Sequence, residues 1–88
     1  MADNIGFGFI QGTGDYINVE TALGVTLEAD KTYSVQIQGK ATFCEGSSKP
    51  DGGGVYWNTL QPFGYKKGTE SLWVKPFEGD TVYINIAE

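Results

Sequence analysis

Few residues of this 88-residue sequence are of the types that usually catalyse reactions. There is no histidine and only one cysteine, Cys44, so neither a Ser-His-Asp nor a Cys-His arrangement can form within one chain. Cys44 stands beside Glu45, and no neighbour along the chain favours the reactive thiolate. This setting is typical of an inert small residue and not of a nucleophile.

Pairs of carboxylates can do acid–base work without histidine. Glu28 with Asp30 and Glu78 with Asp80 each lie two residues apart in a predicted tight turn, where carboxylates are normally solvated. Asp51 precedes three glycines, but no second acidic residue follows at the spacing of a calcium loop. We therefore expect no enzyme, no catalytic residue, no metal site and no cofactor.

The aromatic residues are better candidates, because sugars stack on aromatic faces and aromatic side chains are enriched where proteins meet. Tyr56, Trp57 and Tyr65 lie in one short part of the sequence. They are the candidate platform for a glycan. The plainer alternative is that these large side chains fill the core of a small domain.

A second aromatic set predicts an interface between subunits. Trp73 and Tyr83 alternate with apolar residues in the last two predicted strands, so they occupy the face opposite the core. Phe7 and Phe9 alternate with glycines near the start of the chain. Residues 1–11 could pack on the domain's own core as a strand, or could extend as an N-terminal arm towards a neighbouring subunit.

The elements that must position these aromatics are β-strands. Over residues 33–43 apolar and polar residues alternate, which predicts one long strand with one apolar face. The apolar positions are Tyr33, Val35, Ile37, Ala41 and Phe43. Residues 16–21 and 25–29 keep the same parity and predict, with this strand, a three-stranded meander joined by a tight loop at residues 22–24.

The end of the chain predicts a hairpin between residues 71–76 and 80–87. In that hairpin Val74 faces Val82 and Leu72 faces Ile84.

Between these strands the sequence is rich in glycine. Residues 45–54 contain four glycines and one proline and predict a flexible loop. Residues 55–60 predict a short strand, and residues 61–68 predict irregular backbone.

Together these patterns predict a single all-β domain over residues 1–88, with about six to seven short strands and no significant helix. The expected architecture is a small antiparallel β-sandwich or barrel, jelly-roll-like or Ig-like.

The composition narrows the classes of partner. The formal net charge is −5, with six lysines and no arginine, which argues against nucleic-acid binding. Residues 4–10 are too short and too rich in glycine for a signal peptide, and no apolar run is long enough to span a membrane. A short chain without a disulfide also favours a shared core, so we expect a homo-oligomer.

Two stretches resemble small β-domain proteins of tailed-bacteriophage virions, of the head-decoration, head-fibre or tail-associated type. They are LEADKTYSV at residues 27–35 and SLWVKP with GDTVYINIAE at residues 71–76 and 79–88. The resemblance covers less than half of the chain.

The resemblance implies a structural role without chemistry. It implies a protein made in the host cytoplasm and incorporated in the virion, where it contacts its own copies and other virion proteins. A different class stays open: a small carbohydrate-binding or adhesin-type module that uses the aromatic platform.

Overall fold

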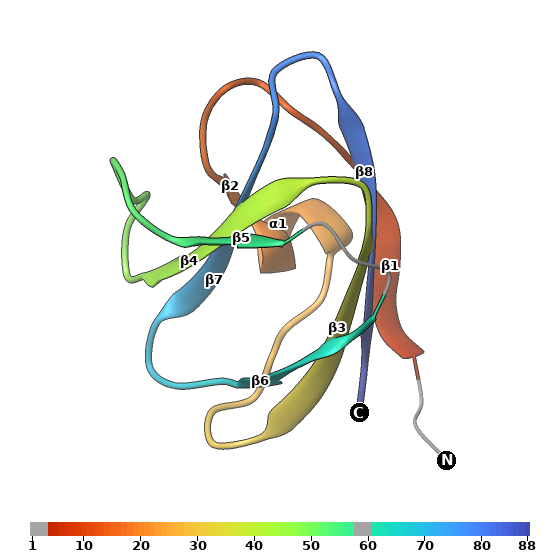
Figure 1. Cartoon of the computed structure of the whole chain (residues 1–88). Helices are drawn as coiled ribbons and strands as arrows, with labels where there is room; N and C mark the ends of the chain where they lie inside the picture. Colours follow the sequence, from red (N-terminus) through yellow and green to blue (C-terminus); the bar gives the residue numbers. More distant parts are fainter. Residues whose placement is uncertain (1–3, 58–60) are drawn as a thin grey trace.

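The computed structural model describes residues 4–57 and 61–88, and in that part of the chain it contains eight strands and one short helix (Figure 1). In chain order these are β1 (Asn4–Gln11), β2 (Ile17–Asn18), α1 (Val19–Leu23), β3 (Thr32–Gln38), β4 (Ala41–Gly46), β5 (Val55–Trp57), β6 (Phe63–Lys66), β7 (Ser71–Pro76) and β8 (Thr81–Ala87). The strands outnumber the six or seven expected from the sequence. The only described helix has five residues.

The strands form two antiparallel sheets of four, in the orders β1-β8-β3-β6 and β2-β7-β4-β5. The first strand pairs with the last, the second with the seventh, the third with the sixth and the fourth with the fifth. These four pairs form one long antiparallel ribbon that folds over on itself. After folding, β3 also pairs with β8 and β4 also pairs with β7, which completes the two sheets. The expected β-sandwich is therefore confirmed, and its strand order is that of a jelly roll.

The apolar faces predicted from alternation are the faces that meet between the sheets. All five apolar positions of residues 33–43 are buried, and so are the alternating positions of the last two strands. The latter are Leu72, Val74, Val82, Ile84 and Ile86. Side-chain parity thus identified the core face correctly in β3, β4, β7 and β8.

The single long strand predicted over residues 33–43 is wrong, because it is two strands in two different sheets. The chain turns between them at Gly39, whose φ of 122° is unfavourable for any residue with a side chain. A Cβ at this position would also lie 2.7 Å from Cγ1 of Val82. The apolar side chains point inward both before and after the turn, so a single alternating pattern in the sequence continues from β3 in one sheet to β4 in the other.

The predicted meander over residues 16–43 is also wrong. Residues 25–29 form no strand, and α1 replaces the second half of the predicted strand 16–21, of which only β2 remains. The Asn18 side chain accepts a hydrogen bond from the Thr21 backbone N–H at 3.1 Å and caps the start of α1. Gly24 ends the helix with a left-handed φ of 70°. The capping residues Asn18 and Gly24 therefore favour a short helix over the strand that the apolar alternation predicted.

The predicted terminal hairpin is wrong as well, although both of its strands exist. Strand β7 pairs with β2 and β4, whereas β8 pairs with β1 and β3 in the other sheet. Val74 lies opposite Phe43 and Ile17, and Val82 lies opposite Ile10. The two strands therefore lie in opposite sheets. Alternation predicted their inner faces correctly, but it does not predict which strand is the hydrogen-bonded neighbour.

The glycine-rich middle of the chain contains more strand than expected. Residues 63–66, predicted as irregular, form β6 against β3, with Tyr65 opposite Tyr33. Residues 55–57 form β5, and the remainder of the strand predicted over 55–60 lies outside the described residues. The loop before β5 contacts the turn after β1: Lys49 forms a 2.7 Å ion pair with Asp15, and the Tyr16 hydroxyl donates to the Gly53 carbonyl.

We expect Gly39→Ala to lower the free energy of unfolding by roughly 1–3 kcal/mol, because alanine must adopt a positive φ and crowd Val82. Chemical denaturation followed by circular dichroism measures this change. Gly52→Ala is the matched control, since its φ is ordinary and nothing lies within 4 Å of the added Cβ. Equal stability of the two variants would contradict the role of Gly39 at the turn.

Candidate functional site

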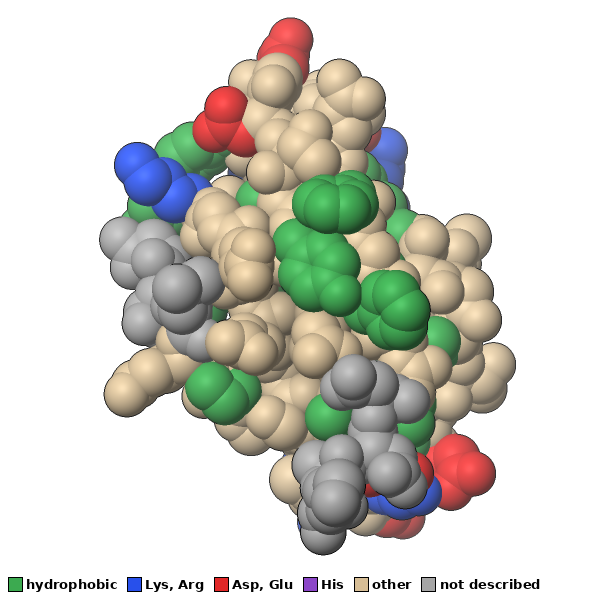
Figure 2. All heavy atoms as spheres, turned by 90° about the vertical axis from the view of Figure 1, so that its right-hand side faces the viewer, with side chains coloured by type: hydrophobic (Ala, Val, Ile, Leu, Met, Phe, Trp, Pro, Cys, Tyr) green, Lys and Arg blue, Asp and Glu red, His purple; other side chains and the backbone are tan. Residues whose placement is uncertain are grey.

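Three of the four candidate interface residues lie together on the outer face of the β1–β8 sheet. Phe9 lies opposite Tyr83 in the β1–β8 pair, with ring centroids 5.1 Å apart, and Phe7 lies 6.4 Å from the same tyrosine. Phe7 is 61% exposed and Phe9 is 75% exposed. We call these three residues the aromatic patch. Figure 2 shows hydrophobic side chains gathered on the side of the molecule where β1 and β8 stand in Figure 1.

The alternation of glycine with phenylalanine in β1 has a packing reason. Gly6 and Gly8 point inward, where a Cβ on Gly6 would lie 2.3 Å from Cγ1 of Val25. A Cβ on Gly8 would lie 3.2 Å from Cδ2 of Leu23. The glycines therefore leave room for the end of α1 and for Val25 just after it. The phenylalanines, on the other face of the strand, are left without cover among the described residues.

Trp73 does not belong to this patch. It lies on β7 in the other sheet, because the predicted hairpin that would have placed it beside Tyr83 does not form. Its indole N–H donates a 2.9 Å hydrogen bond to the Gly46 carbonyl, and its side chain is half-buried. The structure thus assigns Trp73 a contact within its own chain.

The three residues of the predicted glycan platform do not share a face. Trp57 and Tyr65 point into the space between the two sheets, and Tyr65 is only 6% exposed. Tyr56 alternates with Trp57 along β5 and so faces away from that space. It stacks on Phe77 with ring centroids 6.1 Å apart and an interplanar angle of 18°, a pair that the sequence did not predict.

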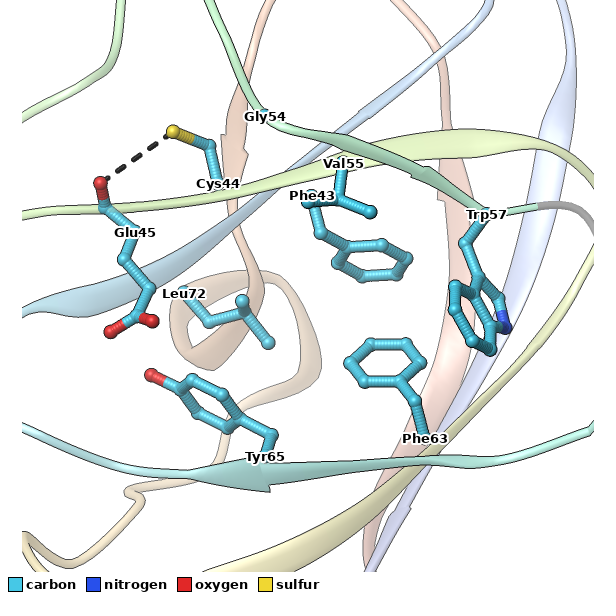
Figure 3. A pocket seen from close by; sticks show the side chains of 9 residues that line it. All are labelled: Phe43, Cys44, Glu45, Gly54, Val55, Trp57, Phe63, Tyr65 and Leu72. Carbon is cyan, nitrogen blue, oxygen red and sulfur yellow. Dashed lines mark hydrogen bonds between the residues drawn. The ribbon is translucent and has the colours of Figure 1, made fainter.

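Trp57 and Tyr65 instead line an apolar cavity of about 350 Å³ between β4, β5 and β7 of one sheet and β6 of the other (Figure 3). The Phe63 ring makes edge-on contacts with Trp57 at 5.0 Å and with Phe43 at 5.1 Å. The lining residues are Phe43, Cys44, Glu45, Gly54, Val55, Trp57, Phe63, Tyr65 and Leu72. Sequence analysis missed Phe43, Val55 and Leu72 here, because strands that are distant in sequence bring them together.

The Tyr65 hydroxyl is the polar group whose setting is least usual. It is buried and has no hydrogen-bond partner among the described residues. Burial, with smaller contributions from the carboxylates of Glu45, Glu20 and Glu70, raises the pKa of Tyr65 to about 12. Figure 3 shows the hydroxyl directed towards Glu45 and away from the Phe43, Phe63 and Trp57 rings. The group therefore stays neutral over the physiological pH range.

Lys67 is a buried cation that sequence analysis did not single out. It is 8% exposed, and its Nζ donates to the Glu70 carbonyl and lies 3.4 Å from Oε2 of Glu20. Oε1 of the same glutamate accepts a 2.8 Å hydrogen bond from the Leu27 backbone N–H. This network ties α1 to the β6–β7 connection.

Within residues 4–57 and 61–88, no cluster of three or more acidic, cysteine or histidine side chains could hold a metal ion. The same residues contain no helix that is long and apolar enough to span a membrane. Comparisons with protein-family models, with curated proteins and with solved structures found no match to this chain.

We expect the stability of the protein to fall as the pH rises from about 10 to about 12. An unfolded tyrosine releases its proton near pH 10, whereas folded Tyr65 keeps its proton up to about pH 12. The contribution of Tyr65 to the free energy of unfolding is therefore fully present below pH 10. Between pH 10 and about pH 12 this contribution falls by at most about 1.4 kcal/mol per pH unit. Denaturant unfolding at several alkaline pH values measures it.

Tyr65→Phe should remove this part of the pH dependence and change stability little at neutral pH, because the hydroxyl lacks a partner. Tyr33→Phe is the matched control. The Tyr33 hydroxyl accepts a 2.8 Å hydrogen bond from the Glu28 backbone N–H, so its loss should cost about 1 kcal/mol at neutral pH. If the loss of stability at alkaline pH is unchanged in Tyr65→Phe, its assignment to Tyr65 is contradicted.

Proposed function

We propose that this chain is a structural, non-catalytic accessory protein of a virion. It acts by packing against other proteins, as a capsid decoration or as a part of a tail or fibre. The observation that carries the proposal is the aromatic patch of Phe7, Phe9 and Tyr83, which places two largely exposed phenylalanines side by side on one sheet face.

A contiguous exposed apolar patch on a small domain is typical of a protein interaction site. Aromatic side chains contribute the most apolar area at such interfaces, and burying one phenylalanine contributes roughly 1.5–3 kcal/mol. The jelly-roll order of the strands also fits, since viral capsid domains use this architecture. Fold alone does not establish function, so the patch and the resemblance of the sequence to virion proteins carry more weight.

The carbohydrate-binding alternative has less support from the geometry. A glycan platform needs exposed aromatic faces with polar groups around them, but Tyr65 is buried and Tyr56 faces away from Trp57. The cavity that holds Trp57 is lined mainly by apolar side chains and offers few partners for sugar hydroxyls. The exposed patch is therefore the stronger basis for a function.

The test is co-sedimentation with particles. Phage particles from the source of this gene are banded in a density gradient, and peptides of the chain are counted in each fraction by mass spectrometry. We expect the wild-type chain to band with the particles, and we expect Phe9→Ser to shift most of it to the free fraction.

Phe77→Ser is the matched control, because Phe77 is also exposed but lies on the β7–β8 loop, where its ring stacks on Tyr56 and not on a residue of the aromatic patch. It should band like the wild type. A wild-type chain found only in the free fraction would overturn the proposed function. Equal loss of both variants from the particles would separate the function from the aromatic patch.

A further inference from the structure

The aromatic patch lies next to a sheet edge that lacks the usual protection. Each sheet has two edge strands, and an edge strand exposes backbone N–H and C=O groups that can pair with another chain. Three of the four edges are short: β2 has two residues, β5 has three and β6 has four. Strand β1 has eight residues, and no strand in the described part of the chain pairs with its outer edge.

Strand β1 is also unguarded in composition. Proteins usually protect long edges with lysine, proline or a bulge, and the sequence NIGFGFIQ contains no charged residue and no proline. The register with β8 shifts once, between Asn4 and Gly6, at the start of the strand. From Gly6 to Gln11 the pairing is regular, so six consecutive residues present an edge without a bulge.

We propose that the occupant of this edge is β1 of a second copy of the chain. The two strands pair antiparallel about a two-fold axis perpendicular to the sheet, so that two four-stranded sheets become one continuous sheet. This inference rests on the proposed function in one respect: the aromatic patch is the contact surface in both proposals. It names the first partner of that patch as the chain itself.

A second copy fits because an antiparallel pair about this axis keeps each strand's outer face on the outside. Only registers that pair odd with odd residues satisfy this condition. Two such registers pair five residues of the regular segment, and the one that pairs both phenylalanines places Phe7 opposite Phe9 of the partner subunit and Gly8 opposite Gly8 of the partner subunit. Cross-strand aromatic pairs stabilise such a ladder, and the patches of both copies then form one row.

The charge distribution agrees with pairing at this strand. Each chain carries a formal net charge of −5, so two copies repel each other overall, but β1 itself is uncharged. Added salt screens the repulsion between the two bodies without weakening the uncharged contact. We therefore expect the dimer to tighten as the salt concentration rises.

Sedimentation velocity over a dilution series tests the inference. We expect a concentration-dependent dimer for the wild type and a monomer for the double variant Phe7→Lys with Phe9→Lys, which places lysines across the interface. Both positions are exposed, and circular dichroism verifies the fold. Phe77→Lys is the matched control and should dimerise like the wild type. A monomeric wild type at all concentrations, or a dimer that survives the double variant, would overturn the inference.

Disulfide trapping tests the register. In a Cys44→Ser background, chains with Phe7→Cys are mixed with chains with Phe9→Cys and oxidised. The proposed register brings residue 7 next to residue 9 of the partner subunit, so the mixed disulfide should form faster than either like pair. Preferential cross-linking of like pairs would overturn this register.

These experiments separate the two proposals. A dimer of the purified chain that never bands with particles overturns the virion role and supports the edge pairing. A chain that bands with particles but stays monomeric in solution supports the virion role and overturns the edge pairing.

Discussion

The rest of the structure depends on the turn at Gly39, where one alternating segment passes from one sheet to the other with its apolar face still inward. The positive φ of this residue and its contact distance to Val82 leave no room for a side chain. Because β3 and β4 then lie in opposite sheets, their neighbours β8 and β7 must lie in opposite sheets too. The folded ribbon of the jelly roll follows from this separation.

Folding the ribbon in this way determines which aromatics are covered. Phe43, Phe63 and Trp57 meet between the sheets, near the edges formed by β5 and β6. Phe7 and Phe9 are excluded, because the inner face of β1 is occupied by the segment after α1. In a chain of 88 residues the core is modest, and the two phenylalanines add none of their ring area to it.

Several ionisable groups make contacts that join separate elements of the fold. Lys67 and Glu20 are paired and hydrogen-bonded where α1 meets the β6–β7 connection. The Lys49 ammonium and the Tyr16 backbone N–H bind the Asp15 carboxylate and lower its pKa. Tyr65 stays protonated because it is buried.

The sequence by itself determined the class of the fold and the inner faces of β3, β4, β7 and β8, because side chains alternate with period two whatever the neighbouring strand is. It also excluded histidine-based chemistry. Only the tertiary structure decided which strands pair, because the parity of Val74 or Val82 does not specify a neighbouring strand. In the structure, the two strands of the predicted hairpin lie in different sheets. That split separated Trp73 from Tyr83 and placed Tyr83 beside Phe9, because a surface patch is made by strands that meet in space and not by residues that are close in sequence.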